Sequence, residues 1–439
     1  MITLIRNVQV LKDDELVSSS IVIDGKLISE ISCDGNLKIK SDKIIDGKNL
    51  VALSGLIDVH VHLREPGLTH KEDFLSGSMA AAAGGVTTVL DMPNTNPPTT
   101  TVKALEEKRE LAKKSIVNYG FYFGATSENI DELLKARNIK SVKIYMGSST
   151  GNLLLKDSEF VENVFRRWNG IITVHAEDEN CLEQQKGKFP MKTENHGKFR
   201  PRECAVIALK KVILFARKYK RHLHIAHIST KEEVDIIKSA KKSGINISCE
   251  VTPHHLFLSE NDLKNLGNFG KMNPPLREKA DCDALWSELG KTIDIVATDH
   301  APHTKEEKLE PYTEAPSGVA GLETTLPLLL DAYNKKKIDL RTLIKVTSEN
   351  PAKVFGIKNK GFLREGFDAD IVLVEIGKVR EVKDSELFTK CKWSPFNSWK
   401  LKGYPVMTFV NGNLIYSNGM PFEITENNKI NAQEVDYNE

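Results

Sequence analysis

The sequence predicts an α/β fold, a TIM-type (β/α)8 barrel with a small β-sandwich-like domain built from both chain ends. Apolar strand-like runs alternate with helical patterns through the middle of the chain, while both ends carry hairpin signals. A length of 439 residues suits one large barrel with a satellite. We place the barrel at residues 52–360, the two parts of the β domain at 1–51 and 361–422, and a polar tail at 423–439.

The two chain ends share one type of pattern. Apolar runs flank Asp24-Gly25, Asp46-Gly47 and Asn411-Gly412, and such pairs are typical of tight hairpins. Residues 368–375, "DADIVLVE", read as a further strand. Neither end has enough strands to bury a sheet alone, so we expect both ends to build one domain together.

Eight strands are expected in the central region. They are residues 56–60, 86–92, 117–123, 141–146, 171–177, 223–227, 245–251 and 293–300. Helical patterns separate most of them, for example at 70–85, 201–220 and 230–244, where Thr230 and Glu233 form a capping-box pattern. The alternative is an open doubly wound sheet, which should carry a Gly-rich phosphate turn after its first strand; the sequence shows none.

The composition of the chain argues against some classes of binding partner. The net charge is +1 and no long basic run occurs, so nothing indicates a nucleic-acid or anionic-membrane partner. No apolar run approaches a membrane span, and Met1 opens directly into a strand pattern without a signal peptide. The six cysteines are scattered, which predicts reduced thiols in a cytoplasmic protein.

Titratable residues gather at the expected strand ends. In "GLIDVHVHLREPG", His60 and His62 stand on alternate positions and can therefore face one point. The ends of four later strands carry Lys143, His175, His227 and Asp299. Because barrel chemistry sits at the carboxyl ends of the strands, these side chains should converge on one mouth and suit a metal ion.

These motifs resemble those of a known family. "DVHVHLREPG", "DMPNTNPP", "CEVTPHHL", "MNPPLRE" and "ATDHAPHT" are similar to signatures of the dihydroorotases, within the amidohydrolase superfamily. The similarity runs from about Asn7 to about Gly419. It implies a (β/α)8 barrel with a β-rich satellite domain, and hydrolysis or closure of cyclic amides at a metal centre, usually zinc.

The resemblance also implies a ligand set. His60, His62 and Asp299 would bind the more buried metal, and His175 and His227 the second. Lys143 would be carboxylated by CO2, so that its carbamate bridges two zinc ions in each subunit. A bridging hydroxide would be the nucleophile, with Asp299 as general acid and base.

Four further residues are expected at the substrate. Arg64 suits the ring carboxylate of dihydroorotate, and the resemblance adds Asn94 and His303 for the same group and Asn273 for the ring amide. The implied reaction is reversible cyclisation of N-carbamoyl-L-aspartate to (S)-dihydroorotate in pyrimidine (UMP) synthesis. The alternatives are allantoinase or another cyclic amidase, and an inactive binding partner. A homodimer and an aspartate carbamoyltransferase partner are left open.

Overall fold

The central region forms the expected barrel. The computed structural model describes residues 1–439 except 34–36, 38, 149–152, 418, 422–431 and 438–439. Its barrel strands are β6 (Leu56–Val61), β7 (Val86–Asp91), β8 (Asn118–Phe121), β9 (Phe123–Gly124), β10 (Ser141–Tyr145), β11 (Ile171–His175), β12 (Leu223–Ile225), β13 (Ile247–Val251) and β14 (Ile295–Val296). Neighbouring strands pair in parallel, β6 to β8 and β9 to β14, and a bridge from Val61 to His300 joins the two ends of the ring. All eight predicted strands are confirmed.

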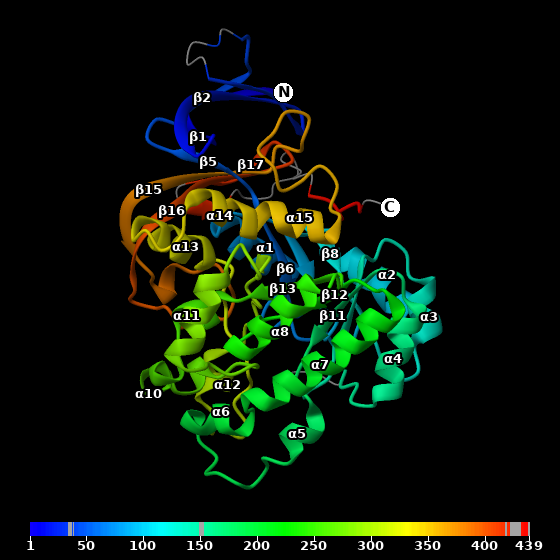
Figure 1. The fold of residues 1–439 in the computed structure, drawn as a ribbon. Helices are drawn as coiled ribbons and strands as arrows, with labels where there is room; N and C mark the ends of the chain where they lie inside the picture. The colour runs from blue at the N-terminus through cyan, green and yellow to red at the C-terminus, as the bar shows by residue number, and fades with distance from the viewer. Residues whose placement is uncertain (34–36, 38, 149–152, 418, 422–431, 438–439) are drawn as a thin grey trace.

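Helices cover the outside of the barrel (Figure 1). The longer ones are α1 (Phe74–Ala83), α2 (Val102–Ala112), α3 (Ile130–Lys135), α4 (Ser158–Arg167), α7 (Arg202–Tyr219), α8 (Lys231–Lys242), α11 (Lys279–Glu288) and α13 (Thr325–Asn334). The shorter ones are α5 (Glu179–Glu183), α6 (His196–Phe199), α9 (Pro253–Phe257), α10 (Leu263–Leu266), α12 (Lys305–Leu309), α14 (Leu340–Ile344) and α15 (Asn350–Phe355), with 3-10 turns η1 (Thr193–Asn195), η2 (Glu260–Asp262), η3 (Gly267–Gly270) and η5 (Asp384–Glu386) and a π turn η4 (Lys345–Glu349). None of these described helices combines the length and apolar character needed to cross a membrane.

Helix α8 shows how sequence pattern and packing agree. Val234, Ile237 and Ala240 recur at helical spacing and are buried against the barrel. Thr230 accepts a hydrogen bond from the backbone N–H of Glu233, whose side chain bonds back to the Thr230 backbone, so the predicted capping box is confirmed.

Both chain ends join one sheet of nine strands. They are β1 (Ile2–Lys12), β2 (Glu15–Asp24), β3 (Leu27–Ser32), β4 (Lys43–Asp46), β5 (Val51–Ser54), β15 (Ile371–Glu381), β16 (Lys400–Val410), β17 (Asn413–Ser417) and β18 (Met420–Pro421). Strand β5 pairs with β1 on one side and with β15 on the other. This joint sheet confirms that the two ends build one domain, whereas the residue boundaries given above stay a prediction.

Two of the three predicted hairpins are confirmed. Asp24-Gly25 joins β2 to β3, and Asn411-Gly412 joins β16 to β17. The hairpin at Asp46-Gly47 is wrong, because β4 and β5 both pair in parallel with β1 and not with each other. A turn in which the Leu50 N–H donates to the Gly47 carbonyl carries the chain between them.

The prediction of six reduced thiols is also wrong. Cys181 in α5 and Cys204 in α7 form a disulfide, with Cα atoms 5.3 Å apart. The two helices lie next to each other after β11, and the Asp178 N–H donates to the Cys204 carbonyl beside the bond. Sequence spacing could not show this contact, because 23 residues separate the two cysteines. Cys33, Cys249, Cys282 and Cys391 are free.

Part of the predicted polar tail packs on the barrel. Val435 is buried, and Tyr119 on β8 forms a bridge with Glu434. Arg109 on α2 also donates to the Glu434 carboxylate at 3.0 Å. This stretch is therefore ordered by contacts that its polar composition did not predict.

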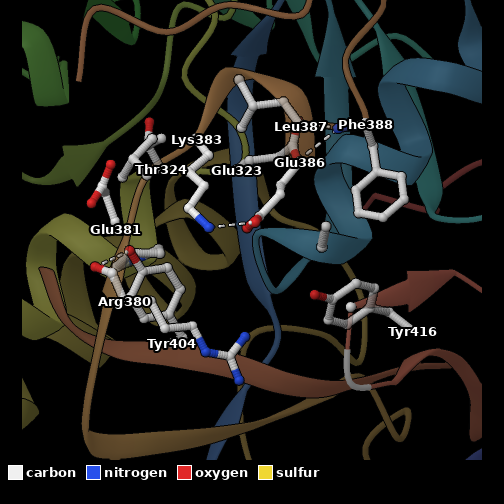
Figure 2. Close-up of a pocket in the computed structure, with 14 residues that line it drawn as sticks. Glu323, Thr324, Arg380, Glu381, Lys383, Glu386, Leu387, Phe388, Tyr404 and Tyr416 are labelled. Atoms are coloured by element: carbon white, nitrogen blue, oxygen red, sulfur yellow. Dashed lines mark hydrogen bonds and ion pairs between the residues drawn. The ribbon is translucent and has the colours of Figure 1, made fainter. Parts of the chain in front are cut away.

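A pocket of about 410 Å3 lies where the β domain meets α1 and α13 (Figure 2). Arg380 and Glu381 on β15, Tyr404 on β16 and Tyr416 on β17 line one side. None of the candidate site residues predicted above lines it. The expected chemistry therefore lies elsewhere, at the carboxyl ends of the barrel strands.

Candidate metal centre

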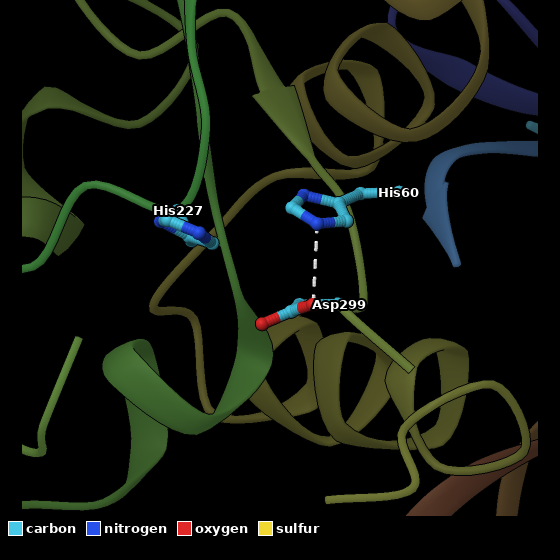
Figure 3. Close-up of side chains that lie close together, drawn as sticks. All are labelled: His60, His227 and Asp299. Atoms are coloured by element: carbon cyan, nitrogen blue, oxygen red, sulfur yellow. Dashed lines mark ion pairs between the residues drawn. The ribbon is translucent and has the colours of Figure 1, made fainter. Parts of the chain in front are cut away.

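The predicted strand-end residues converge inside the barrel mouth. Nε2 of His60 lies 3.2 Å from Oδ1 of Asp299, and Nε2 of His62 lies 3.0 Å from the same oxygen. His227 joins His60 and Asp299 in one buried group whose donor atoms all lie within 4.8 Å of one another (Figure 3). Three nitrogen or oxygen donors so close together, enclosed by protein, can hold a metal ion.

His227 also lies in contact with His175, the last of the candidate histidine ligands. His175, at the end of β11, has its Nδ1 2.9 Å from Nε2 of His227, and both rings are buried. The Nδ1 atom of His227 has no hydrogen-bond partner among the described residues. A buried nitrogen without a partner is costly in protein alone, so this atom suits a metal ligand.

Lys143 on β10 is enclosed among these side chains. Its Nζ is fully buried and has no hydrogen-bond partner in the described part of the chain. Burial lowers the pKa of Lys143 to about 8, with Glu250 and Asp299 acting in the opposite direction. No carboxylate of the described residues forms an ion pair with Nζ, as a buried structural ammonium would require. An amine of lowered pKa is partly neutral near pH 8 and can react with CO2.

Two buried carboxylates orient the histidines, and sequence analysis did not assign either. Glu250 on β13 forms a short hydrogen bond with Nδ1 of His60, and its other oxygen lies 3.1 Å from His224. Burial alone would raise the pKa of Glu250, but His60 and His224 hold it below its usual range. Carboxylate contacts of this kind fix the tautomer of a metal-binding imidazole.

Glu177 has the same role at His175. Its Oε2 lies 2.9 Å from Nε2 of His175 and 2.6 Å from Nη2 of Arg200, which also donates to the Ser148 carbonyl. The signal that could have identified Glu177 and Glu250 was a carboxylate within a strand or directly after it, among apolar neighbours. Such a residue is rarely buried without a cationic or hydrogen-bonded partner.

Arg64 and His303 come together beside this cluster. Nη2 of Arg64 lies 3.1 Å from Nε2 of His303, and Nε donates to the Pro302 carbonyl at 3.1 Å. Arg64 is buried, and burial lowers its pKa to about 10, so the guanidinium stays charged at neutral pH. The structure thus offers a desolvated cationic fork, which suits a carboxylate.

The other two predicted substrate residues, Asn94 and Asn273, each contact a histidine. Oδ1 of Asn94 is 2.6 Å from Nδ1 of His62, so this amide touches a candidate metal ligand. Oδ1 of Asn273 is 2.9 Å from Nε2 of His196, on the wall of a pocket of about 630 Å3. Of the four, only Arg64 and His303 contact each other.

Three site residues have strained backbone conformations. Arg64, His227 and Asp299 have φ angles of +64°, +36° and +46°, in the left-handed region that favours glycine. Such conformations persist where the surrounding structure holds them, and they are frequent at active sites. They turn these side chains inward directly after a strand.

Comparison with known proteins identifies a family that fits this cluster of histidine and aspartate side chains. Residues 51–415 match the model of the amidohydrolase family. A protein named dihydroorotase from Methanosarcina mazei is 40% identical over 428 residues, covering 94% of this chain and 93% of the relative. One of the same name from Lactobacillus gasseri is 36% identical, covering 95% and 100%.

Solved structures show the same architecture. The L-hydantoinase (dihydropyrimidinase) of Arthrobacter aurescens superposes with a TM-score of 0.93 at 27% identity, covering 99% of both chains. The dihydropyrimidinase of Brevibacillus agri has a TM-score of 0.91 at 27% identity, covering 100% of this chain and 99% of the other. The barrel, the histidine and aspartate cluster and the match over most of the sequence together establish that this chain belongs to the amidohydrolase family.

Proposed function

We propose that this chain catalyses the reversible cyclisation of N-carbamoyl-L-aspartate to (S)-dihydroorotate with loss of water, a step of pyrimidine (UMP) synthesis. The observation that carries the proposal is the buried contact between Arg64 and His303 beside the candidate metal ligand Asp299. Dihydroorotate carries a ring carboxylate, which substrates of the hydantoinase type lack. Relatives 36–40% identical over nearly the whole chain, all named dihydroorotase, support the same substrate.

The residues present fit a pair of zinc ions. His60, His62 and Asp299 would hold one ion and His175 and His227 the other, and Lys143, as a carbamate, would supply anionic oxygen ligands. In forming that carbamate, the neutral Nζ would bond to the carbon of CO2, the electron pair of one C=O π bond would move onto its oxygen, and the N–H proton would go to solvent water. Lys143 Nζ and His227 Nδ1 support this assignment, because both buried atoms lack a hydrogen-bond partner among the described residues.

The ions, when bound, supply Lewis acidity for activating water and polarising the amide carbonyl. The chain supplies the remaining steps. The Asp299 carboxylate takes the proton of the attacking water during hydrolysis and gives it to the leaving ring nitrogen; in cyclisation it carries the proton the other way. Although burial would raise the pKa of Asp299, His60 and His62 hold it well below its usual range. The carboxyl group is therefore deprotonated before the reaction and can accept a proton.

Arg64 and His303 hold the ring carboxylate in this proposal, which sets the orientation of the scissile amide. Burial and the neighbouring Arg64 cation keep the pKa of His303 well below its usual range, so the imidazole is neutral. Asn94 is assigned to the same carboxylate and Asn273 to the ring amide. The homodimer, the aspartate carbamoyltransferase partner and the cytoplasmic location stay predictions.

A substrate panel tests the proposal. Zinc-loaded protein should cyclise N-carbamoyl-L-aspartate and hydrolyse dihydroorotate, and should use allantoin and hydantoin far less well. Chelated protein should be inactive, and zinc should restore it. A higher kcat/KM for allantoin would favour the cyclic-amidase alternative. Full metal content without turnover of any substrate would favour the inactive binding partner.

A further inference from the structure

The chain between β15 and β16, residues 382–399, leaves the β domain and packs against the barrel. We name it the 382–399 connection. Trp393 and Phe396 are each 1% exposed, and they join a core cluster with Met272, Leu276 and Val319 of the barrel. A link between two adjacent antiparallel strands needs only a few residues. This one is longer and buries large side chains beside the barrel mouth, which suggests a role in holding that region.

One polar contact of the 382–399 connection is with the backbone of His303. The indole Nε1 of Trp393 donates to the His303 carbonyl at 2.7 Å. The ring packs edge-on against Phe269, with centroids 4.9 Å apart. This hydrogen bond fixes the backbone of the residue whose imidazole contacts Arg64.

The second contact reaches the residue after Asp299. The Thr389 hydroxyl donates a short hydrogen bond to Oε2 of Glu72, which is fully buried, and the same oxygen lies 3.5 Å from Nε2 of His300, within ion-pair distance. Nδ1 of His300 accepts from the Gly321 N–H at 3.2 Å, so a neutral imidazole carries its proton on Nε2, the nitrogen that lies near Glu72 but has no hydrogen-bond partner among the described residues. The His300 carbonyl in turn accepts from the His62 N–H at 2.8 Å.

The third contact lies at the wall of the pocket in Figure 2. The backbone N–H groups of Phe388 and Thr389 donate to the half-buried carboxylate of Glu323 at 2.9 to 3.0 Å. Glu323 follows the Gly321 turn that meets His300. The stretch 388–393 therefore contacts three segments around the β14 end: the one holding Glu72, the one following Asp299, and the one following Gly321.

We propose that Thr389 and Trp393 are positioning residues, through which the C-terminal half of the β domain holds Asp299 and His303 in their working geometry. Asp299 has a left-handed φ of +46°, a conformation that needs support from its surroundings. Thr389 provides it through Glu72 and His300, and Trp393 holds the carboxylate-binding side through the His303 backbone. This inference rests on the proposed function and extends it to residues that touch neither metal nor substrate.

The experiment compares Thr389→Val, which removes one donor with little change in shape, and Trp393→Phe, which removes one donor and part of a buried ring. Losing one buried hydrogen bond to a positioned group should change a rate or an affinity by about tenfold. Thr389→Val should mainly lower kcat, because it acts on Asp299. Trp393→Phe should mainly raise KM for N-carbamoyl-L-aspartate, because it acts on the carboxylate side.

Two variants serve as matched controls. Thr389→Ser keeps the hydroxyl and should restore kcat to near the wild-type value. Trp399→Phe lies in the same connection, where Trp399 stacks edge-on against Phe396 at 5.2 Å, and should leave both kinetic constants unchanged. Melting temperatures of all four variants separate a loss of stability from a loss of positioning.

Release of zinc to a chelator provides a readout that does not need turnover. Because Asp299 is assigned as a ligand, Thr389→Val should release zinc several-fold faster than Thr389→Ser. If wild-type protein does not act on N-carbamoyl-L-aspartate, the proposed function fails while zinc release still tests the positioning of Asp299. Lower melting temperatures with wild-type kcat, KM and zinc release would overturn the inference, and so would equal effects of Thr389→Val and Thr389→Ser.

Discussion

Arg64 is the residue on which the assignment of substrate depends most. Its guanidinium is buried between His303 and the Pro302 carbonyl. Arg64→Gln should lower kcat/KM for dihydroorotate by a factor equivalent to about 2–5 kcal/mol, because a buried carboxylate loses its charged partner. Zinc content, measured by elemental analysis, should not change.

The control for this variant is Arg221→Gln. Like Arg64, Arg221 donates to backbone carbonyls, in this case those of Phe165 and Arg166. It donates to no candidate site residue in the described part of the chain. Its kcat/KM should equal that of the wild type. Wild-type kcat/KM in Arg64→Gln would mean that another group binds the carboxylate.

Lys143 carries a second prediction at this scale. Lys143→Ala should lose at least one zinc ion per subunit, because the remaining ligands cannot offset the repulsion of two dications at short range. Short carboxylic acids should restore part of the activity by occupying the vacated space. Wild-type zinc stoichiometry and rate in folded Lys143→Ala would exclude a bridging carbamate.

The six candidate metal ligands could be predicted from the sequence because a barrel brings its strand ends together. Each of the six lies within a recognisable strand or follows one. The sequence did not predict that Glu177 would contact His175 or that Glu250 would contact His60. Their roles depend on which side chains meet across neighbouring strands and the segments that follow them, and residue spacing within one strand does not fix these contacts.

Among the elements, the pair α5 and α7 departs most from expectation, because Cys181 and Cys204 are bonded. Thiol titration of denatured protein without reductant should therefore count four of the six cysteines. Cys204→Ser should lower the free energy of unfolding by about 2–4 kcal/mol, since the unfolded chain regains freedom. Cys33→Ser, at an exposed free cysteine, should have no effect. Six titratable thiols would refute the disulfide.

The failed hairpin at Asp46-Gly47 shows a limit of local signals. The same turn residues serve equally well where the chain reverses between two strands and where it only steps along one edge. Here β4 pairs with residues 3–6 of β1 and β5 with Gln9 and Val10, both in parallel, so the turn carries the chain along β1 without reversing its direction. Pairing with β1, which is distant in the sequence, therefore determines that β4 and β5 form no hairpin.

At the scale of the whole molecule, a buried polar network ties the β domain to the barrel. Nζ of Lys360 lies 2.8 Å from Asp368, 2.9 Å from Asp370 and 3.0 Å from Asn411. Asn118 on barrel strand β8 donates to Asp370 at 3.0 Å and accepts from Asn411 at 2.8 Å. Because one set of bonds spans both parts, we expect the chain to unfold in a single transition.

Removing the cation at the centre of this network tests that expectation. Lys360→Met leaves two buried carboxylates without their counter-charge and should lower the free energy of unfolding by about 3–5 kcal/mol. Lys26→Met is the matched control, since Lys26 also pairs with Asp368, at 3.6 Å, but is 55% exposed and should contribute at most about 1 kcal/mol. Adding Asp370→Asn to Lys360→Met should recover part of the loss. Denaturant unfolding followed by both tryptophan fluorescence and circular dichroism measures these differences. Equal, small effects of the two lysine variants, or separate transitions in the wild type, would show that the barrel is stable without this link.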